Sequence, residues 1–98
     1  MKITKNMNGN NLEVAVEGRL DTTTAPELEQ ELKASMDAAE TLTMDFAKLD
    51  YISSAGLRVL LAAHKTMSKK GGMKVTNVNE IVNEVFEVTG FVDILTIE

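Results

Sequence analysis

The stretch "TLTMDFAKLDYISSAGLRVLL", residues 41–61, contains two different hydrophobic periods within one short segment. Leu42, Met44 and Phe46 alternate with polar residues, and this period of two is typical of a β-strand with one buried face. Beyond a turn around Asp50, apolar residues recur at i, i+3, i+4 and i+7, which predicts an amphipathic helix. A strand followed so closely by a helix indicates a sheet with helices packed on it.

Short segments with one or the other of these periods follow one another along the whole chain. We expect a hairpin in residues 1–18, helices in residues 24–36, 51–72 and 79–90, strands in residues 41–46 and 73–78, and a possible edge strand in residues 93–98. The predicted fold class is therefore α/β, with a mixed sheet of four to five strands and helices packed on it, in the order ββαβαβα(β). After the N-terminal hairpin, the strands should run parallel through right-handed crossovers.

The helix expected in residues 24–36 has a well-defined start. Thr24 and Glu27 have the spacing of a capping box, and Pro26 lies in the first turn, where its missing N–H costs nothing. Gly90 supplies the C-cap of the helix in residues 79–90. The side chains expected to face the core are Ala25, Leu28, Leu32 and Met36 in the first of these helices, and Ile81, Val82, Val85 and Phe86 in the second.

Composition limits the classes of protein to consider. The chain has 98 residues, of which 44% are apolar and 26% charged, so we expect one globular domain over residues 1–98. The net charge is −5 and the ten Lys and Arg residues form no basic stripe, so no nucleic acid partner is expected. The chain has no cysteine, no signal-peptide pattern and no run near the roughly 20 apolar residues that a membrane span needs. We therefore expect a soluble cytoplasmic protein without a membrane partner.

Two adjacent serines, Ser53 and Ser54, lie at the start of the helix that follows the Asp50 turn. The simplest interpretation makes one of them an N-cap, which stabilises a helix by about 1 kcal/mol. A cap needs only one hydroxyl, however, and Gly56 in the first turn suggests that something approaches the backbone closely. The serines are also expected on the rim where the C-terminal ends of the strands meet, together with the loop "GRLDTTT".

A helix N-terminus accommodates a doubly charged phosphate, because its free N–H groups and the helix dipole favour anions. Phosphorylation of a serine at this position would leave the fold intact while changing the surface by nearly two charges. The segment therefore has the properties of a phosphorylation switch.

Three segments carry a resemblance to a known family. "GRLDTTTAPELEQEL", "LTMDFAKLDYISSAGLRVLL" and "GGMKVTNVNEIVNEVFEVTGFVDIL" resemble the STAS domain of the bacterial anti-sigma factor antagonists, and the resemblance covers nearly the whole chain. It implies a STAS-like mixed sheet and a small cytoplasmic regulator of sigma-factor-dependent transcription. In this family the unphosphorylated antagonist binds an anti-sigma factor that is also a serine kinase. Phosphorylation of a loop serine breaks the complex, and a phosphoserine phosphatase restores it.

The resemblance implies a role for one of the two serines. The family's phosphoacceptor falls on Ser54, two residues before Gly56, with Ser53 as the alternative acceptor. Many members have aspartate where this chain has Ser53, and serine or threonine where it has Ala55. Asp21 matches the aspartate that the family carries on the neighbouring loop. The residues expected to contact the partner are Asp21, Thr22, Ser53, Ser54, Ala55, Gly56 and Arg58.

Asp21 and Arg58 each have a simpler interpretation beside the functional one. Asp21 could equally form a local turn bond with Thr23 or Thr24, because Asp side chains commonly bond to the backbone just ahead of them. Arg58 has the spacing of a solvated helix arginine, and nothing in the local sequence demands a contact for it. The residues alone leave both alternatives open.

An enzyme is the least favoured class. Ser54 and His64 are ingredients of a hydrolase triad, but ten helical positions separate them by ~15 Å. His64 continues an apolar series and is expected to be partly buried. No glycine-rich phosphate loop, metal-spaced histidine pair or nucleophile elbow occurs, so we predict no catalytic residue, metal or cofactor. The alternative function is a stand-alone STAS domain that senses a nucleotide or another small ligand, and we expect a monomer.

Overall fold

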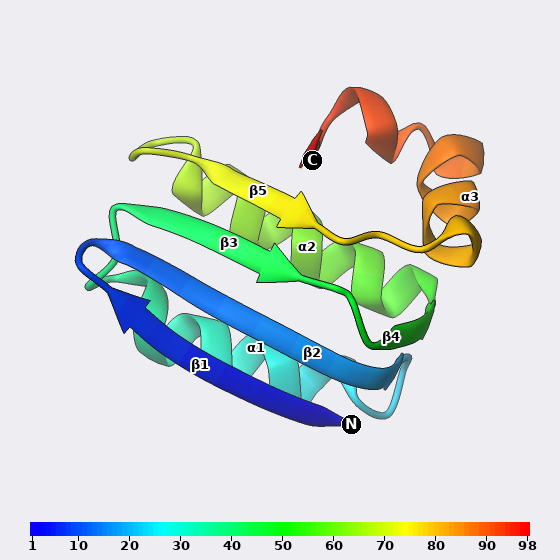
Figure 1. The fold of residues 1–98 in the computed structure, drawn as a ribbon, viewed down its shortest axis with the longest axis horizontal. Coiled ribbons are helices and arrows are strands. Elements are labelled where there is room, and N and C mark those ends of the chain that lie inside the picture. Colours follow the sequence, from blue (N-terminus) through cyan, green and yellow to red (C-terminus); the bar gives the residue numbers. More distant parts are fainter.

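A six-stranded mixed sheet lies at the centre of the structure, a computed structural model that describes residues 1–98 (Figure 1). The strands are β1 (Lys2–Asn8), β2 (Asn11–Leu20), β3 (Thr41–Asp45), β4 (Leu49–Ile52), β5 (Met73–Thr76) and β6 (Thr96–Ile97). The helices are α1 (Ala25–Met36), α2 (Ser54–Met67), α3 (Glu80–Thr89) and the short 3-10 helix η1 (Phe91–Asp93). The predicted α/β class is confirmed. None of these helices has both the length and the apolar character needed to cross a membrane.

The sheet combines one antiparallel pair with parallel strands, as predicted. β1 and β2 form the N-terminal hairpin, and β3, β5 and β6 then follow in parallel, in the spatial order β1-β2-β3-β5-β6. The edge strand expected near the C-terminus is β6. Helices α1 and α2 lie side by side behind the sheet in Figure 1, while the face toward the viewer is left open.

β2 is long enough to pair with two strands in succession. Its residues 11–15 pair with β3, and its last three residues pair with β4. The register shifts between Gly18 and Arg19, and Gly18 adopts a φ of +97°, which a residue with a side chain rarely does. β4 was not predicted, because its four residues are too few for a clear alternating pattern. Helix α2 accordingly begins at Ser54, after this strand.

The predicted inward faces of the helices are confirmed with one exception. The buried side chains of α1 are Ala25, Leu28, Leu32 and Met36, as expected, and those of α3 are Val82 and Phe86. Val85 is half-buried, but Ile81 is 59% exposed, so its predicted inward position was wrong. α3 carries apolar residues on more than one face, and Val82 and Phe86 occupy the face that packs on the core. Gly90 forms the left-handed C-cap of α3, as predicted.

The start of α1 is where it was predicted, but it is stabilised differently. Thr24 is the N-cap residue, yet its side chain makes no capping hydrogen bond. Its hydroxyl instead donates to the carbonyl oxygen of Arg19 over 2.8 Å and accepts from the N–H of Asp21 over 2.8 Å. The capping-box prediction was therefore wrong, because backbone groups of the preceding loop engage the hydroxyl. The carbonyl oxygen of Asp21 accepts the N–H of Ala25 over 2.8 Å.

Gly56 lets α2 approach the ends of β2 and β4, and this close approach can be tested. A Cβ atom at Gly56 would lie 2.7 Å from Cγ of Leu20 and 2.8 Å from Cγ1 of Ile52, two fully buried side chains. Overpacking typically costs about 1–3 kcal/mol, more than the ~1 kcal/mol of helix propensity that alanine adds. We expect Gly56→Ala to lower the free energy of unfolding by about 1 kcal/mol in a urea titration followed by circular dichroism.

A control on the same helix separates packing from propensity. Ala62 lies on the exposed face of α2, so Ala62→Gly measures the propensity difference alone. A Gly56→Ala protein at least as stable as the wild type would show that α2 does not approach the strands this closely.

Candidate functional site

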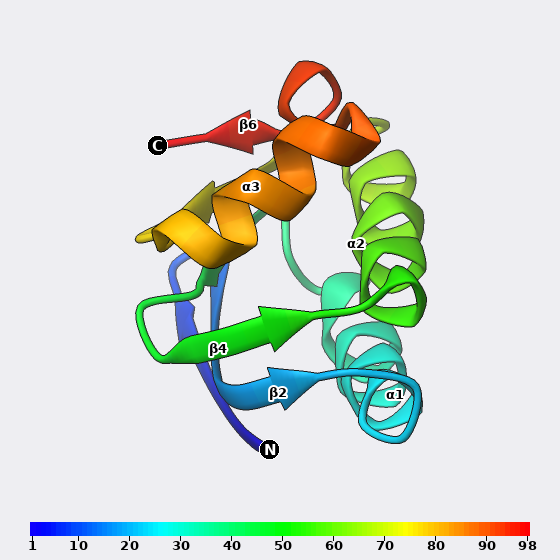
Figure 2. The ribbon, with the colours of Figure 1, turned by 90° about the vertical axis from the view of Figure 1, so that its right-hand side faces the viewer.

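The ends of β2 and β4 place two loops next to each other (Figure 2). The backbone N–H of Ser53 donates to the carbonyl oxygen of Leu20 over 2.9 Å, and Leu20 pairs with Ile52 in the parallel ladder. Asp21 directly follows Leu20 in the chain, and Ser54 directly follows Ser53. The two loops that were expected on one rim therefore leave the sheet together, and we call residues 19–24 and 51–55 the β2–β4 rim.

Ser53 and Ser54 have different environments on this rim. Ser53 is the N-cap residue of α2, with extended backbone, and its carbonyl oxygen accepts the N–H of Leu57 over 3.0 Å. Its side chain does not cap the helix, so that expected hydrogen bond is absent. The hydroxyl oxygen of Ser53 is buried and has no hydrogen-bond partner. Ser54, by contrast, is exposed as the first residue of α2.

The N-terminal end of α2 is electrostatically suited to an anion. The N–H groups of the first helical turn have no acceptor within the helix, and the dipole places partial positive charge there. No acidic side chain lies in this turn to compensate that charge. The exposed Ser54 therefore lies at the positive end of α2, and no side chain of the first turn neutralises the partial positive charge there.

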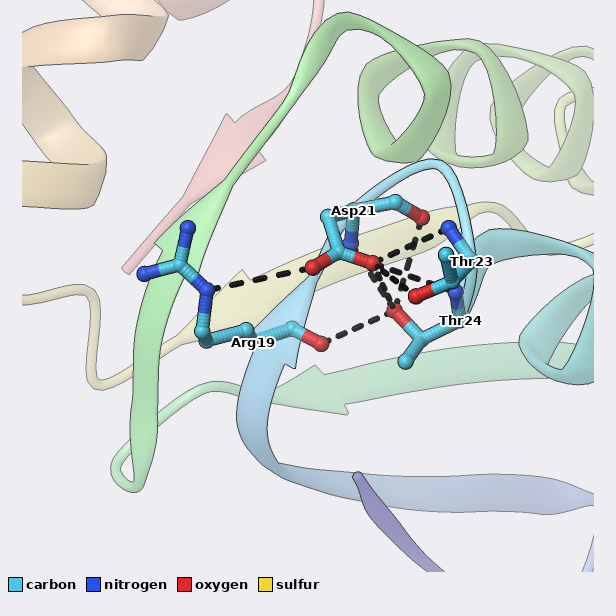
Figure 3. A network of polar contacts seen from close by, with 4 residues as sticks. All are labelled: Arg19, Asp21, Thr23 and Thr24. Carbon is cyan, nitrogen blue, oxygen red and sulfur yellow. Dashed lines mark hydrogen bonds and ion pairs between the residues drawn. The ribbon is translucent and has the colours of Figure 1, made fainter.

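Asp21 is held by a local network of hydrogen bonds (Figure 3). Its Oδ1 accepts from the hydroxyl of Thr23 over 2.7 Å, from the N–H of Thr23 over 3.0 Å and from the N–H of Thr24 over 3.2 Å. Its Oδ2 lies 3.8 Å from Nε of Arg19. The hydrogen bond from the Thr23 side chain, helped by those from the backbone, holds the pKa of the Asp21 carboxyl below its usual range. The local-turn interpretation of Asp21 is thus confirmed, and its carboxylate is fixed on the rim.

Arg19 and Tyr51 belong to the rim but were not predicted. They are paired across β2 and β4, with the guanidinium carbon of Arg19 4.5 Å from the centre of the Tyr51 ring. Because β4 was not predicted, the pairing of Arg19 with Tyr51 could not be predicted either. For Arg19 alone the sequence held a signal: alternation in "GRLD" puts Arg19 and Asp21 on the same side of the strand. The Arg19 side chain is 63% exposed, so its ion pair with Asp21 contributes little stability.

A hollow of about 210 Å³ lies between the first turns of α1 and α2. Thr22, Ala55 and Arg58 contribute to its lining, so three residues expected to contact a partner share one depression. Gly56 is buried on the side of α2 that packs against Leu20 and Ile52, so it positions the helix and is not exposed to a partner. A larger hollow, of about 380 Å³, lies at the opposite end of the sheet and is lined by none of the expected residues.

The pKa of Asp21 gives a test of the rim geometry. Thr23→Val removes the hydroxyl and keeps the shape of the side chain, so we expect the pKa of Asp21 to rise toward its usual value. Because this pKa is lower in the folded than in the unfolded chain, its contribution to stability is present above the unfolded pKa and disappears as the pH falls through the folded pKa. The variant should therefore lose less stability on acidification through that range.

The measurement is a carbon-detected NMR titration of the Asp21 carboxyl, with Thr22→Val as the control, since Thr22 is exposed and makes no hydrogen bond to Asp21. An unchanged pKa in Thr23→Val would contradict the network.

Comparison with known proteins identifies the family of the chain. The model of the STAS domain matches residues 2–98. BtrV of Bordetella bronchiseptica, named as an anti-sigma factor antagonist, is 36% identical over 99 residues, which cover 99% of this chain and 85% of that protein. The anti-sigma-B factor antagonist of Bacillus subtilis is 31% identical over 91 residues, covering 92% of this chain and 84% of that protein.

A solved structure agrees with these relatives. The crystal structure of an anti-sigma factor antagonist from Mycobacterium paratuberculosis superposes with a TM-score of 0.89 at 25% identity, covering 98% of this chain and 83% of that one. The fold, the matched domain and the sequence relatives point the same way. The chain therefore belongs to the STAS domain family, and its relatives within that family are bacterial anti-sigma factor antagonists.

Proposed function

We propose that this chain is an anti-sigma factor antagonist whose binding is controlled by phosphorylation of Ser54. In the unphosphorylated state it binds an anti-sigma factor that has serine kinase activity, and the phosphorylated state releases that partner. The class of partner follows from the names of the relatives. The observation that carries the proposal is the exposed Ser54 at the first turn of α2, directly beside the Asp21 loop.

Accessibility favours Ser54 over Ser53 as the phosphoacceptor. A kinase must bring the γ-phosphorus of ATP to the hydroxyl oxygen, and the oxygen of Ser53 is buried. In the transfer, the bond between Oγ of Ser54 and the γ-phosphorus forms as the bond from that phosphorus to ADP breaks, and a base of the kinase takes up the hydroxyl proton. The positive end of α2 accommodates the resulting dianion without a change of fold.

The charge of the rim explains why phosphorylation would break a complex. Asp21 already presents a carboxylate whose pKa is held low, so it is ionised at neutral pH. A phosphate on Ser54 adds about −1.5 to −2 charges to the neighbouring loop. The phosphate would repel the nearby Asp21 carboxylate, and a partner surface fitted to a neutral hydroxyl would bear the cost of making room for a dianion and desolvating it. Removal of the phosphate by a phosphoserine phosphatase returns the binding form.

The position of the phosphate is the first test. We expect incubation with ATP and the anti-sigma kinase to place one phosphate on Ser54, located by tandem mass spectrometry. Ser54→Ala should carry none, whereas Ser53→Ala should be labelled like the wild type because its missing hydroxyl is a buried one. A phosphate on Ser53, or continued labelling of Ser54→Ala, would contradict the assignment.

The effect on binding is the second test. Ser54→Asp should weaken the complex with the anti-sigma factor by more than about tenfold, or ~1.4 kcal/mol, in isothermal titration calorimetry. Its melting temperature should change little, because an acidic residue suits the first turn of a helix. Ala34→Asp adds the same charge at an exposed position of α1 and should bind normally. Equal affinities of Ser54→Asp and the wild type would rule out control at this serine.

A further inference from the structure

The net charge of the chain is confined to its C-terminal part. All ten Lys and Arg residues occur at or before Lys74, together with ten of the fifteen acidic residues, so residues 1–74 have no net charge. Residues 75–98 hold the other five, Glu80, Glu84, Glu87, Asp93 and Glu98, and no basic residue. Glu98 pairs with Lys74 over 3.5 Å, but the other four carboxylates form no ion pair. The charge of −5 is therefore localised on α3, η1 and the chain end.

α3 also has a second apolar side, which is exposed at both ends and half-buried at Val85. Val82 and Phe86 face the core, whereas Ile81, Val85 and Val88 recur at i, i+4 and i+7 along a different side of the helix, which we call the α3 stripe. Ile81 is 59% exposed and Val88 is 84% exposed. The following turn, which packs on α3, adds Val92 at 37% and Ile94 at 43%.

Single exposed apolar residues are normal, but several in one helical row typically form an interaction surface. The bordering charges decide which kind of partner fits. Glu84 lies one turn from both Ile81 and Val88, and Glu80 and Glu87 lie at the two ends of the stripe. A second copy of the chain would bring the same unpaired carboxylates into contact, which is unfavourable. A partner with an apolar face bordered by Lys and Arg would match both features.

We propose that the α3 stripe is a docking surface for a basic amphipathic helix of a partner protein. Such a helix would place its apolar residues on Ile81, Val85 and Val88 and its cations beside the carboxylates of Glu80, Glu84 and Glu87, which lie along one flank of the stripe. The α3 stripe has no residue in common with the β2–β4 rim. α3 lies against β4, where the Asn79 side chain donates to the carbonyl oxygen of Leu49 over 2.6 Å, and Figure 2 shows α2 on another side of that strand. The proposal therefore does not depend on Ser54.

A synthetic peptide provides the probe. It has about 14 residues, with Leu at i, i+3, i+4 and i+7 and Lys elsewhere, and a second peptide has the same composition in shuffled order. We expect titration of the first into ¹⁵N-labelled protein to shift amide signals of α3 and η1 and not those of the rim. The shuffled peptide should bind at least about tenfold more weakly.

Variants test the apolar part of the surface. The double substitution Ile81→Ser, Val88→Ser should weaken binding of the first peptide at least about tenfold, and it should leave the fold intact because both side chains are exposed. Met7→Ser removes an apolar side chain that is 42% exposed on β1, away from α3, and should not change the affinity. Ser54→Ala should also bind the peptide normally, so this result is independent of the proposed phosphorylation.

Charge reversal tests the specificity of the electrostatic part. Glu84→Lys should weaken binding, whereas Glu40→Lys, which changes the net charge equally at an exposed site between α1 and β3, should have little effect. Equal losses in the two variants, or signal shifts spread over the whole surface, would overturn the proposal. So would a dimer of the free chain in analytical ultracentrifugation that the Ile81→Ser, Val88→Ser protein no longer forms, since the stripe would then belong to a second copy.

Discussion

The parallel pairing of the last three residues of β2 with β4 is the constraint on which the candidate site depends. β2 extends beyond its pairing with β3, its register shifts after Gly18, and its C-terminal end pairs with β4. A slip of one residue in either strand would turn the fully buried side chain of that strand, Leu20 of β2 or Ile52 of β4, away from the core. Because Gly56 packs on the same two side chains, the register also sets the position of α2. One arrangement of buried residues therefore places Asp21 and Ser54 on a common rim.

The structure separates two kinds of surface on the two sides of β4. The rim brings together a fixed carboxylate, the positive end of α2 and an exposed hydroxyl, so a phosphate added to that hydroxyl would change the local charge strongly. On α3, carboxylates without an ion pair lie beside an exposed apolar row, and such a surface favours a partner of opposite charge. In the function proposed above, phosphate on Ser54 acts at the rim, and the contact proposed for α3 is one that this phosphate does not directly oppose.

The sequence predicts those parts of the fold in which one periodic face is buried. β2, α1 and α2 each have such a face, and His64 lies half-buried at the edge of α2 as expected. β4 was missed because four residues carry too little periodicity. Ile81 was misplaced because α3 is apolar on two sides and only packing decides which is buried.

Some features of the candidate site could likewise be predicted from the sequence, and others could not. Their loops could be placed on one rim from the order of strands and helices, and the bond of Asp21 to the threonines was one of two alternatives that the residue types left open. The burial of the Ser53 hydroxyl and the exposure of Ser54 depend on how closely α2 meets the strands, which no local pattern contains. The hydroxyl of Thr24 was assigned to the wrong partner for a similar reason.

The hydrogen bond from Ser53 to Leu20 can be observed directly in solution. In protein labelled with ¹⁵N and ¹³C, NMR detects scalar coupling across a hydrogen bond between the amide nitrogen and the carbonyl carbon. We predict a resolved coupling between the nitrogen of Ser53 and the carbonyl carbon of Leu20, with slow exchange of the Ser53 amide proton. Absence of this coupling, together with rapid exchange at Ser53, would show that β4 does not pair with β2 and that the two loops are not held together.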